Sequence, residues 1–363
     1  MILIILIAYV FLLSVLLISS GKREIVKPQN KKTKFSIIVP FRNEEKNLEG
    51  FINGIVEQDY PRDAFELVLV NDASSDNGEF ICNELLKQSG IAYRILKNEI
   101  RLGKKSSISK AVDSSKYEFI ITRDADTENV SKNWLASISD YLIQTNKKFV
   151  ILPVISLPSN SLISMLQFAE SIALKIITGG SANLMHPILC SGANLCYHRK
   201  YFETNPYLDN VNIESGDDTF LLKKALKVGK GEIGYFGSFE VNIITKPNQN
   251  LYDMFKQKVR WAKKLTREPL SFNSLFGLFL IIVNVTTLIS WVLLLIHLHK
   301  PLIPLIFLIS KHLIDILLVF LAPDTLKWKF NIVYLVLAAL IYPFYTLSVF
   351  LLSVFGYKTE WKN

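Results

Sequence analysis

The sequence predicts an α/β domain with a mostly parallel sheet, flanked by apolar segments that are long enough to cross a membrane. Three observations predict this organisation. Near-continuous apolar strand patterns alternate with helical patterns between residues 34 and about 264. Uncharged or almost uncharged runs of roughly 20 residues lie on both sides of that region. The composition, with 50% hydrophobic and 20% charged residues, excludes a disordered chain.

The first apolar run extends from Ile2 to Ser20 and contains no charge. Six basic residues follow it and none precedes it: Lys22, Arg23, Lys27, Lys31, Lys32 and Lys34. A cleavable signal peptide carries its positive charge in front of the apolar run, so we expect an uncleaved anchor instead. The positive-inside bias places its basic end in the cytoplasm.

The central region predicts alternating elements in a regular order. We expect strands over Phe35–Pro40, Glu66–Val70, Tyr93–Leu96 and Phe119–Thr122, and helices over Asn43–Gln58, Glu79–Gln88 and Lys105–Ser114. In parallel sheets of this kind, ligands bind beyond the carboxyl ends of the strands. Asp72 follows the second strand, and the pair Asp124 and Asp126 follows the fourth. The sequence therefore predicts a site at that edge.

Each of these motifs has a structural and a functional interpretation. Asp124 and Asp126 are either a solvated turn or ligands of a divalent cation such as Mg²⁺ or Mn²⁺, which prefers carboxylate oxygens. Asp72 is either a turn residue or an acceptor for the base or ribose of a nucleotide. Lys104 follows a glycine in a basic loop that does not match a P-loop.

Two further groups follow in the second half of the domain. Asp217 and Asp218 lie at the start of a helix that continues to Leu226. They are either helix caps or a general base that deprotonates an acceptor hydroxyl. The motif residues Gln257, Arg260 and Trp261 lie in a basic amphipathic stretch before the next apolar run. That stretch suits a membrane surface, and the motif residues also suit an acceptor site.

Taken together and in this order, the motifs resemble the membrane-anchored family 2 glycosyltransferases, the class that contains cellulose, chitin and hyaluronan synthases and many lipid-linked sugar transferases. The resemblance covers residues 34 to about 264. It implies a GT-A (Rossmann-like) nucleotide-sugar transferase domain, in which a set of residues binds the donor: Pro40, Arg42, Glu44, Asp72, Lys104 and Asp124.

The resemblance also assigns the remaining motifs. Asp124 and Asp126 match the metal-binding D-x-D, and residues 191–194 with His198 and Arg199 are similar to the acceptor-side segment. The family often has Glu-Asp in its base motif where this chain has two aspartates. Alignment to the following helix makes Asp218 the base and Asp217 its support, with Glu214 as a weaker alternative. Three residues match Q-x-x-R-W and are implied to bind the acceptor or the diphosphate: Gln257, Arg260 and Trp261.

The implied activity is inverting transfer of a sugar from a nucleotide-diphosphate sugar, UDP-linked by preference, to a lipid-linked or saccharide acceptor. A divalent cation is the implied cofactor. Q-x-x-R-W is associated with processive polysaccharide synthases, but the small membrane portion favours transfer of one or a few sugars. A catalytically inactive membrane scaffold of the same fold is the other alternative. We expect no nucleic-acid partner, because the net charge of +9 is concentrated beside the apolar runs, where it suits membrane lipids.

The expected domains are an anchor at residues 1–21, a transferase domain at 34–240, an amphipathic interface segment at 241–272 and C-terminal membrane helices at 273–357. The last part holds three apolar runs: Ser274–Leu298, Pro301–Ala322 and Ile332–Phe355. The middle run contains Lys311, His312 and Asp315, so the sequence predicts two or three spans and a pairing of Lys311 with Asp315.

One apolar segment, Leu162–Ile177, has two interpretations: a helix on the membrane surface or a core helix. For the whole protein, we expect an integral protein of a bacterial inner membrane with a cytoplasmic catalytic domain. The bacterial origin rests on an abundance of Ile, Lys and Asn that is typical of an A+T-rich genome.

Overall fold

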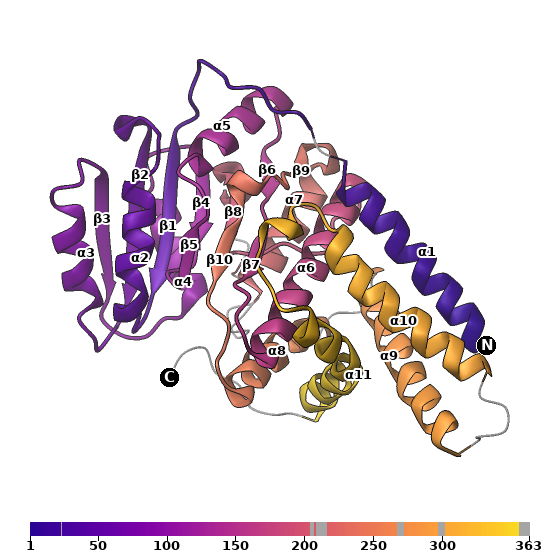
Figure 1. Ribbon diagram of the computed structural model, residues 1–363. Coiled ribbons are helices and arrows are strands. Elements are labelled where there is room, and N and C mark those ends of the chain that lie inside the picture. Colours follow the sequence, from indigo (N-terminus) through magenta and orange to yellow (C-terminus); the bar gives the residue numbers. More distant parts are fainter. Residues whose placement is uncertain (23, 204–206, 208–215, 267–271, 297–301, 356–363) are drawn as a thin grey trace. The chain divides into compact units, whose positions relative to one another are not determined.

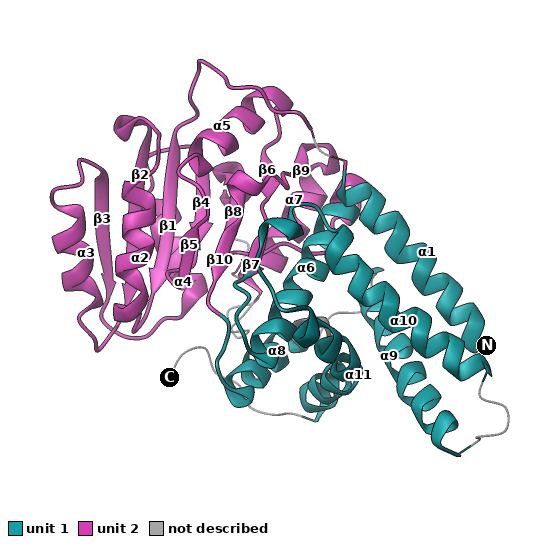
Figure 2. Ribbon diagram, viewed as in Figure 1, with its two compact units in different colours: residues 1–21, 156–180, 247–360 teal, residues 22–155, 181–246, 361–363 magenta. Residues whose placement is uncertain are grey.

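The structure, a computed structural model, describes the whole chain except residues 23, 204–206, 208–215, 267–271, 297–301 and 356–363. It divides into two compact units, which are described separately (Figure 2). The sheet unit comprises residues 22–155, 181–246 and 361–363, and the helical unit comprises residues 1–21, 156–180 and 247–360.

The sheet unit contains a seven-stranded sheet in the order β3-β2-β1-β4-β8-β6-β9 (Figure 1). Its strands are β1 (Phe35–Phe41), β2 (Phe65–Asp72), β3 (Ala92–Asn98), β4 (Phe119–Arg123), β6 (Phe149–Ile151), β8 (Asn194–His198) and β9 (Ile233–Tyr235). Strands β1 to β4 are parallel, and β8 runs antiparallel to both β4 and β6. A second sheet joins β5 (Thr127–Asn129), β10 (Ile243–Thr245) and β7 (Val154–Ser156). The four predicted strands and their parallel arrangement are confirmed.

Helices cover both faces of the large sheet because successive strand residues are apolar on both sides. Ile37 and Val39 of β1 pack in one core with α2 (Glu45–Val56), α3 (Gly78–Leu86) and α5 (Trp134–Thr145). Ile38 packs in a second core with α4 (Lys104–Ser114) and α7 (Asp217–Val228). Short 3₁₀ helices complete the unit: η1 (Arg62–Ala64), η2 (Arg199–Phe202), η4 (Lys230–Glu232) and η5 (Phe239–Val241). Residues buried on both faces leave only the strand ends for polar chemistry.

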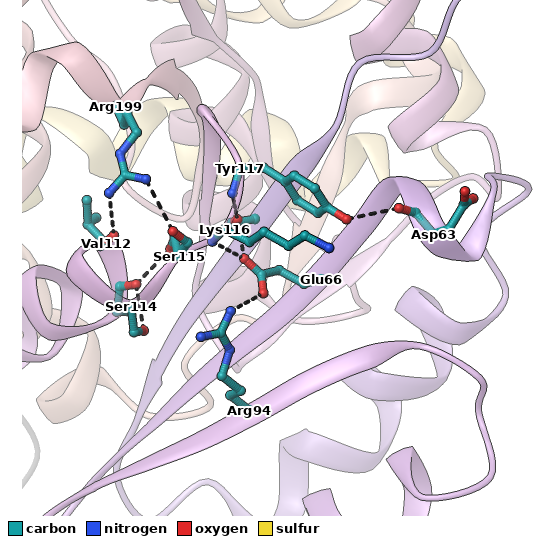
Figure 3. Close-up of polar contacts among 11 residues, drawn as sticks. Asp63, Glu66, Arg94, Val112, Ser114, Ser115, Lys116, Tyr117 and Arg199 are labelled. Atoms are coloured by element: carbon teal, nitrogen blue, oxygen red, sulfur yellow. Dashed lines mark hydrogen bonds and ion pairs between the residues drawn. The ribbon is translucent and has the colours of Figure 1, made fainter.

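The amino end of the sheet is closed by a polar network (Figure 3). The carboxylate of Glu66 accepts hydrogen bonds from the Ser36 hydroxyl (2.6 Å), the Lys116 backbone N–H (2.5 Å) and the Arg94 guanidinium (2.6 Å). Burial opposes the charge of Glu66, but these donors outweigh it and lower its pKa. Arg199 donates to backbone oxygens in the last turn of α4 (3.2 and 3.4 Å). The network is structural, because the chain itself supplies the donors.

The helical unit contains the apolar helices and one amphipathic helix. Its elements are α1 (Ile2–Ser20), α6 (Leu162–Asn183), α8 (Leu251–Thr266), α9 (Phe272–Ile296), α10 (Leu302–Leu321), η6 (Thr325–Lys327) and α11 (Ile332–Val354). Among the described residues, five helices are long and apolar enough to cross a membrane, namely α1, α6, α9, α10 and α11. Four of them correspond to the predicted apolar runs, and α6 is the addition.

The predicted ion pair in the middle run is present. Lys311 Nζ lies 2.6 Å from Asp315 Oδ2, four residues further along α10. The Tyr9 hydroxyl of α1 donates a hydrogen bond to Asp315 Oδ1 (2.7 Å). This hydrogen bond links the N-terminal helix to α10. These contacts give each charged side chain of this pair a partner among long apolar helices, which a charge in such a position requires.

Of the two interpretations of the segment 162–177, the structure supports the core helix. Met165, Phe168 and Ile176 of α6 are fully buried. The ring of Phe168 lies 5.4 Å from that of Phe330, between α10 and α11. A Cβ on Gly180 would clash with the backbone of Leu16, so α6 and α1 pack with their backbones close together.

Candidate active site

The loops that follow β1 and β2 are tied together at the carboxyl end of the sheet. Pro40 lies within β1, and Glu44, just beyond it, is buried. Arg42 donates to the backbone oxygen of Asp72 (2.8 Å) and to that of the next residue (2.5 Å). The predicted donor-binding residues of the opening motif therefore lie at the end of β2, beside the aspartate predicted to bind the nucleoside.

Asp72 is fully buried and anchors the loop that leads into α4. Its Oδ1 accepts hydrogen bonds from Asn98 Nδ2 (2.8 Å) and the Leu102 N–H (2.9 Å), and its Oδ2 accepts from the Gly103 N–H (2.9 Å). Gly103 has a φ of +85°, which favours glycine there. Asp72 thus fixes the backbone immediately before Lys104. Its predicted contact with the nucleoside stays a prediction.

Lys104 is the centre of the charged cluster at this edge. Its Nζ lies 2.7 Å from Asp124 Oδ1 and 3.4 Å from Asp217 Oδ2. Burial works against the ammonium charge, but Asp124 and Asp217, with Asp218 further away, outweigh burial and raise the pKa of Lys104. These ion pairs hold the Lys104 ammonium at a fixed place between two acidic segments.

The two aspartates of α7 have different surroundings. Asp217 is buried and faces Lys104. Asp218 accepts hydrogen bonds from the Thr219 N–H (2.7 Å) and hydroxyl (3.2 Å), at the start of its own helix. The ion pair gives Asp217 a partner within the chain. This difference agrees with a supporting role for Asp217 and leaves Asp218 as the candidate base. Glu214 lies outside the described residues.

The turn that carries Asp124 and Asp126 is held by Arg123, which the sequence analysis did not single out. Arg123 is fully buried and lies over the ring of Trp134, with its guanidinium carbon 4.7 Å from the centroid. It donates to Thr127 Oγ1 (3.0 Å), and that hydroxyl donates to the Asp124 backbone oxygen (2.6 Å). A charged residue at the end of the apolar run 119–122 is the signal that marks it.

The segment 191–194 lies beside the cluster of Lys104 and Asp217, but His198 and Arg199 do not. A Cβ on Gly192 would lie 2.6 Å from Asp217 Oδ2 and 3.7 Å from Lys104 Nζ, so a larger residue there would displace the Asp217 carboxylate. His198 and Arg199 lie at the other end of β8, which pairs His198 with Phe119 at the start of β4. Their expected place on the acceptor side is therefore wrong, because the extended strand carries them across the sheet.

Asp124 and Asp126 have the ligand chemistry that a divalent cation prefers. Asp124 keeps 34% of its side chain exposed although it pairs with Lys104, and Asp126, at the other end of the turn, is half-buried. Carboxylate oxygens are the ligands that Mg²⁺ and Mn²⁺ prefer. Within the described part of the chain, no group of three or more His, Cys, Asp or Glu side chains could hold a metal. A cation here would thus take its remaining ligands from a substrate or from water.

The third predicted group belongs to the helical unit. Gln257, Arg260 and Trp261 lie on α8, and each is at least partly exposed. Gln257 Oε1 accepts a hydrogen bond from Asn248 Nδ2 (2.9 Å), and Lys258 Nζ lies 4.3 Å from the centroid of the Trp261 ring. The predicted roles of the three residues stay predictions.

Comparisons with known proteins agree with the geometry of the sheet unit. The family described as Glycosyl transferase family 2 matches residues 36–203. Poly-beta-1,6-N-acetyl-D-glucosamine synthase of Staphylococcus epidermidis is 25% identical over 104 residues, which cover 28% of this chain and 24% of that protein. Dodecaprenyl-phosphate galacturonate synthase of Rhizobium johnstonii is 26% identical over 107 residues, which cover 29% and 31% respectively. The matches span less than a third of these relatives.

One solved structure is similar along nearly the whole chain. It is that of the mannosyltransferase PcManGT from Pyrobaculum calidifontis, in complex with GDP-Man and Mn²⁺. The TM-score is 0.61 at 16% identity, with 98% of this chain and 96% of that chain covered. At this identity the likeness shows the fold, which is the predicted GT-A fold.

Proposed function

We propose, from the premise that the chain carries a glycosyl transferase family 2 domain at residues 36–203, that the protein is a membrane-bound inverting glycosyltransferase. It moves a sugar from a nucleotide-diphosphate sugar to a lipid-linked or saccharide acceptor. The observation that carries the proposal is the cluster of Lys104, Asp124 and Asp217 beyond the carboxyl ends of the strands. Lys104 provides positive charge beside a leaving diphosphate, and a cation held by the D-x-D turn would add to it.

The chain's own residues supply most of the proposed mechanism. Asp218 accepts the proton of the acceptor hydroxyl while that oxygen forms a bond to the anomeric carbon. The bond between the anomeric carbon and the diphosphate oxygen breaks on the opposite face, and its electrons remain on the diphosphate. Lys104 stabilises that charge, and Asp72 holds the loop that positions Lys104. A divalent cation bound by Asp124 and Asp126 would add further charge stabilisation of the diphosphate.

The finer assignments rest on the resemblance and on the names of similar proteins. A UDP-linked donor follows from the resemblance, whereas PcManGT binds GDP-Man, so both nucleotides belong in the test. The galacturonate synthase is named for a dodecaprenyl-phosphate product and the N-acetylglucosamine synthase for a polysaccharide, which supports the two acceptor classes. Gln257, Arg260 and Trp261 would bind the acceptor or the diphosphate.

The proposed location is a bacterial inner membrane with the catalytic domain in the cytoplasm. It is supported by the apolar helices α1, α9, α10 and α11 and by the basic residues that follow α1. We propose that α10 spans the membrane, since its charges are paired within the helical unit.

The test is release of nucleoside diphosphate by the detergent-solubilised protein. A panel of UDP- and GDP-sugars is supplied with Mg²⁺ or Mn²⁺, with membrane lipid extract as acceptor. We expect release that follows one sugar, stops when EDTA removes the metal and is lost in Asp218→Asn. The length of the product separates a single transfer from processive synthesis. Absence of both release and donor binding would instead support the inactive scaffold.

A further inference from the structure

The helix α6 bears polar side chains that contact the neighbourhood of the motif helix α8. Gln167 and Glu170, one turn apart on α6, contact Asn248 and Lys258 respectively. All four residues belong to the helical unit. Nothing in the family motifs refers to α6, so these contacts are an independent observation about how the motif residues are held.

The orientation of the Gln167 amide is fixed by backbone groups. Its Oε1 accepts from the Asn248 backbone N–H (2.9 Å), which can only donate. Its Nε2 donates to the backbone oxygens of Asn248 (3.0 Å) and Ile163 (3.1 Å), which can only accept. Exchanging the oxygen and nitrogen of this amide would break all three hydrogen bonds.

This orientation determines the next two amides in turn. Asn248 places one terminal atom 3.2 Å from Gln167 Oε1, so that atom must be the donor Nδ2. The same Nδ2 lies 2.9 Å from a terminal atom of Gln257, so the Gln257 atom must be the acceptor Oε1. The Nε2 group of Gln257 is therefore turned away from Asn248. It makes no hydrogen bond with any residue that the structure describes.

A second contact from α6 supports the same helix. Lys258, which is buried, forms an ion pair with Glu170, and its Nζ lies over the ring of Trp261. The polar side of α6 thus holds α8 at Gln257 through Asn248 and at Trp261 through Lys258. An ion pair with such low exposure keeps its geometry better than a solvated one.

We propose that Gln167 and Asn248 are positioning residues that orient Gln257 so that it presents its amide nitrogen, and not its oxygen, to the substrate. The proposal rests on the proposed function and refines it. A side chain that offers only N–H donors selects an acceptor atom, such as a phosphate oxygen or the oxygen of a sugar hydroxyl. Arg260 lies three residues further along the same helix, and its guanidinium can donate hydrogen bonds but cannot accept them. It therefore suits the same oxygen acceptors of the substrate.

The test replaces the donor group of Asn248 by an acceptor of the same size. In Asn248→Asp, the carboxylate can only accept at neutral pH, so Gln257 turns its Nε2 toward residue 248 and its oxygen toward the substrate. We expect kcat/KM for the donor or the acceptor to fall by about 10- to 100-fold, the scale of a hydrogen bond to a charged group. The matched control is Asn133→Asp, the same change at the exposed residue before α5, whose side chain makes no capping hydrogen bond. Its kcat/KM and melting temperature should remain near those of the wild type.

Two further measurements separate orientation from a general disturbance. In a Gln257→Ala background, Asn248→Asp should cause no further loss of kcat/KM, because it acts through Gln257. The ratio of Asn248→Asp activity to wild-type activity should rise as the pH falls toward about 5, since the new carboxyl group, once protonated, donates as the original amide does. The same ratio for Asn133→Asp should stay level.

Each outcome decides between the two proposals. Two results would overturn this inference alone. One is an Asn248→Asp variant that turns over as fast as the wild type. The other is an Asn248→Asp change that lowers kcat/KM as much in the Gln257→Ala background as in the wild type. A wild type that neither turns over nor binds any nucleotide sugar would overturn the proposed function and, with it, the substrate assigned to Gln257. If Asn248→Asp fails to fold, Gln257→Glu keeps the oxygen toward Asn248 and removes the donors. It should show the same loss of kcat/KM.

Discussion

The two ends of the large sheet both hold buried charges, but they use them differently. At the amino end, Glu66 accepts hydrogen bonds from Ser36, Arg94 and the Lys116 backbone, and its side chain is only 4% exposed. At the carboxyl end, a single ammonium, that of Lys104, is shared between two carboxylates, and further aspartates follow each of them in the sequence. A carboxylate that the chain fully satisfies is structural, whereas Asp124 keeps 34% of its side chain exposed beside Lys104, where the proposed donor would bind.

The largest expected effect in this comparison is at Asp218. Asp218→Asn keeps the size of the side chain but removes the proton acceptor, so kcat should fall by about 10²- to 10⁴-fold. Donor binding should be unchanged, since the mutated group acts on the acceptor. Initial rates and calorimetric binding of the nucleotide sugar check the two halves of the prediction.

The control for this change is Asp113→Asn, on the exposed side of α4 in the same unit. It should have wild-type rates. If Asp218→Asn turns over as fast as the control, the base assignment is wrong and Glu214, the weaker alternative, becomes the next candidate.

A smaller effect is expected where the backbone makes room for the cluster. In Gly192→Ala, the new methyl group would lie 2.6 Å from Asp217 Oδ2, so the carboxylate must move away from Lys104. Because misplacements of about 1 Å can cost up to 10²-fold, we expect kcat/KM to fall by roughly 10- to 100-fold. Steady-state kinetics with a melting curve measures this.

Gly231→Ala is the matched control, because a Cβ there meets no atom within 4 Å. It should change neither rate nor stability. Equal behaviour of the two alanine variants would show that Asp217 does not need its observed position, and the contrast between the two sheet ends would lose its strongest geometric support.

The sequence predicts the strands and the ends at which they stop well, because continuous apolar runs mark them. The apolar runs that end at Asp72 and Asp124 define both the sheet and the site, and the spacing of Lys311 and Asp315 predicts their ion pair. Such signals are local, since they depend on the spacing of neighbours along one element.

The features that the sequence analysis missed are long-range. Gln167 and Asn248 are 81 residues apart, and no periodicity within either segment indicates their partnership. The resemblance groups His198 and Arg199 with residues 191–194, which lie at the other end of β8. A strand rises by about 3.3 Å per residue, so five residues of β8 are enough to separate the two ends of the sheet.

The smallest expected effect on activity, and the one that sharpens the contrast most directly, is at Glu66. Glu66→Gln removes the charge that three donors share, and the Gln amide nitrogen can no longer accept from Arg94. We expect a loss of about 1–3 kcal/mol in the free energy of unfolding and an unchanged kcat/KM. Chemical unfolding of the detergent-solubilised protein measures the first quantity, and Glu84→Gln, on the exposed side of α3, is the control.

The same variant makes a prediction about pH. The pKa of Glu66 is lower in the folded protein than in the unfolded chain, so its stabilisation is complete above the unfolded pKa and is lost as the pH falls through the folded pKa. The difference in unfolding free energy between the wild type and Glu66→Gln should therefore shrink below about pH 4. A difference that persists unchanged into acid would mean that the shape of the side chain, and not its charge, stabilises this end of the sheet. A loss of kcat/KM at constant stability would mean that the two ends of the sheet are functionally coupled, contrary to the division of roles argued from their hydrogen bonds.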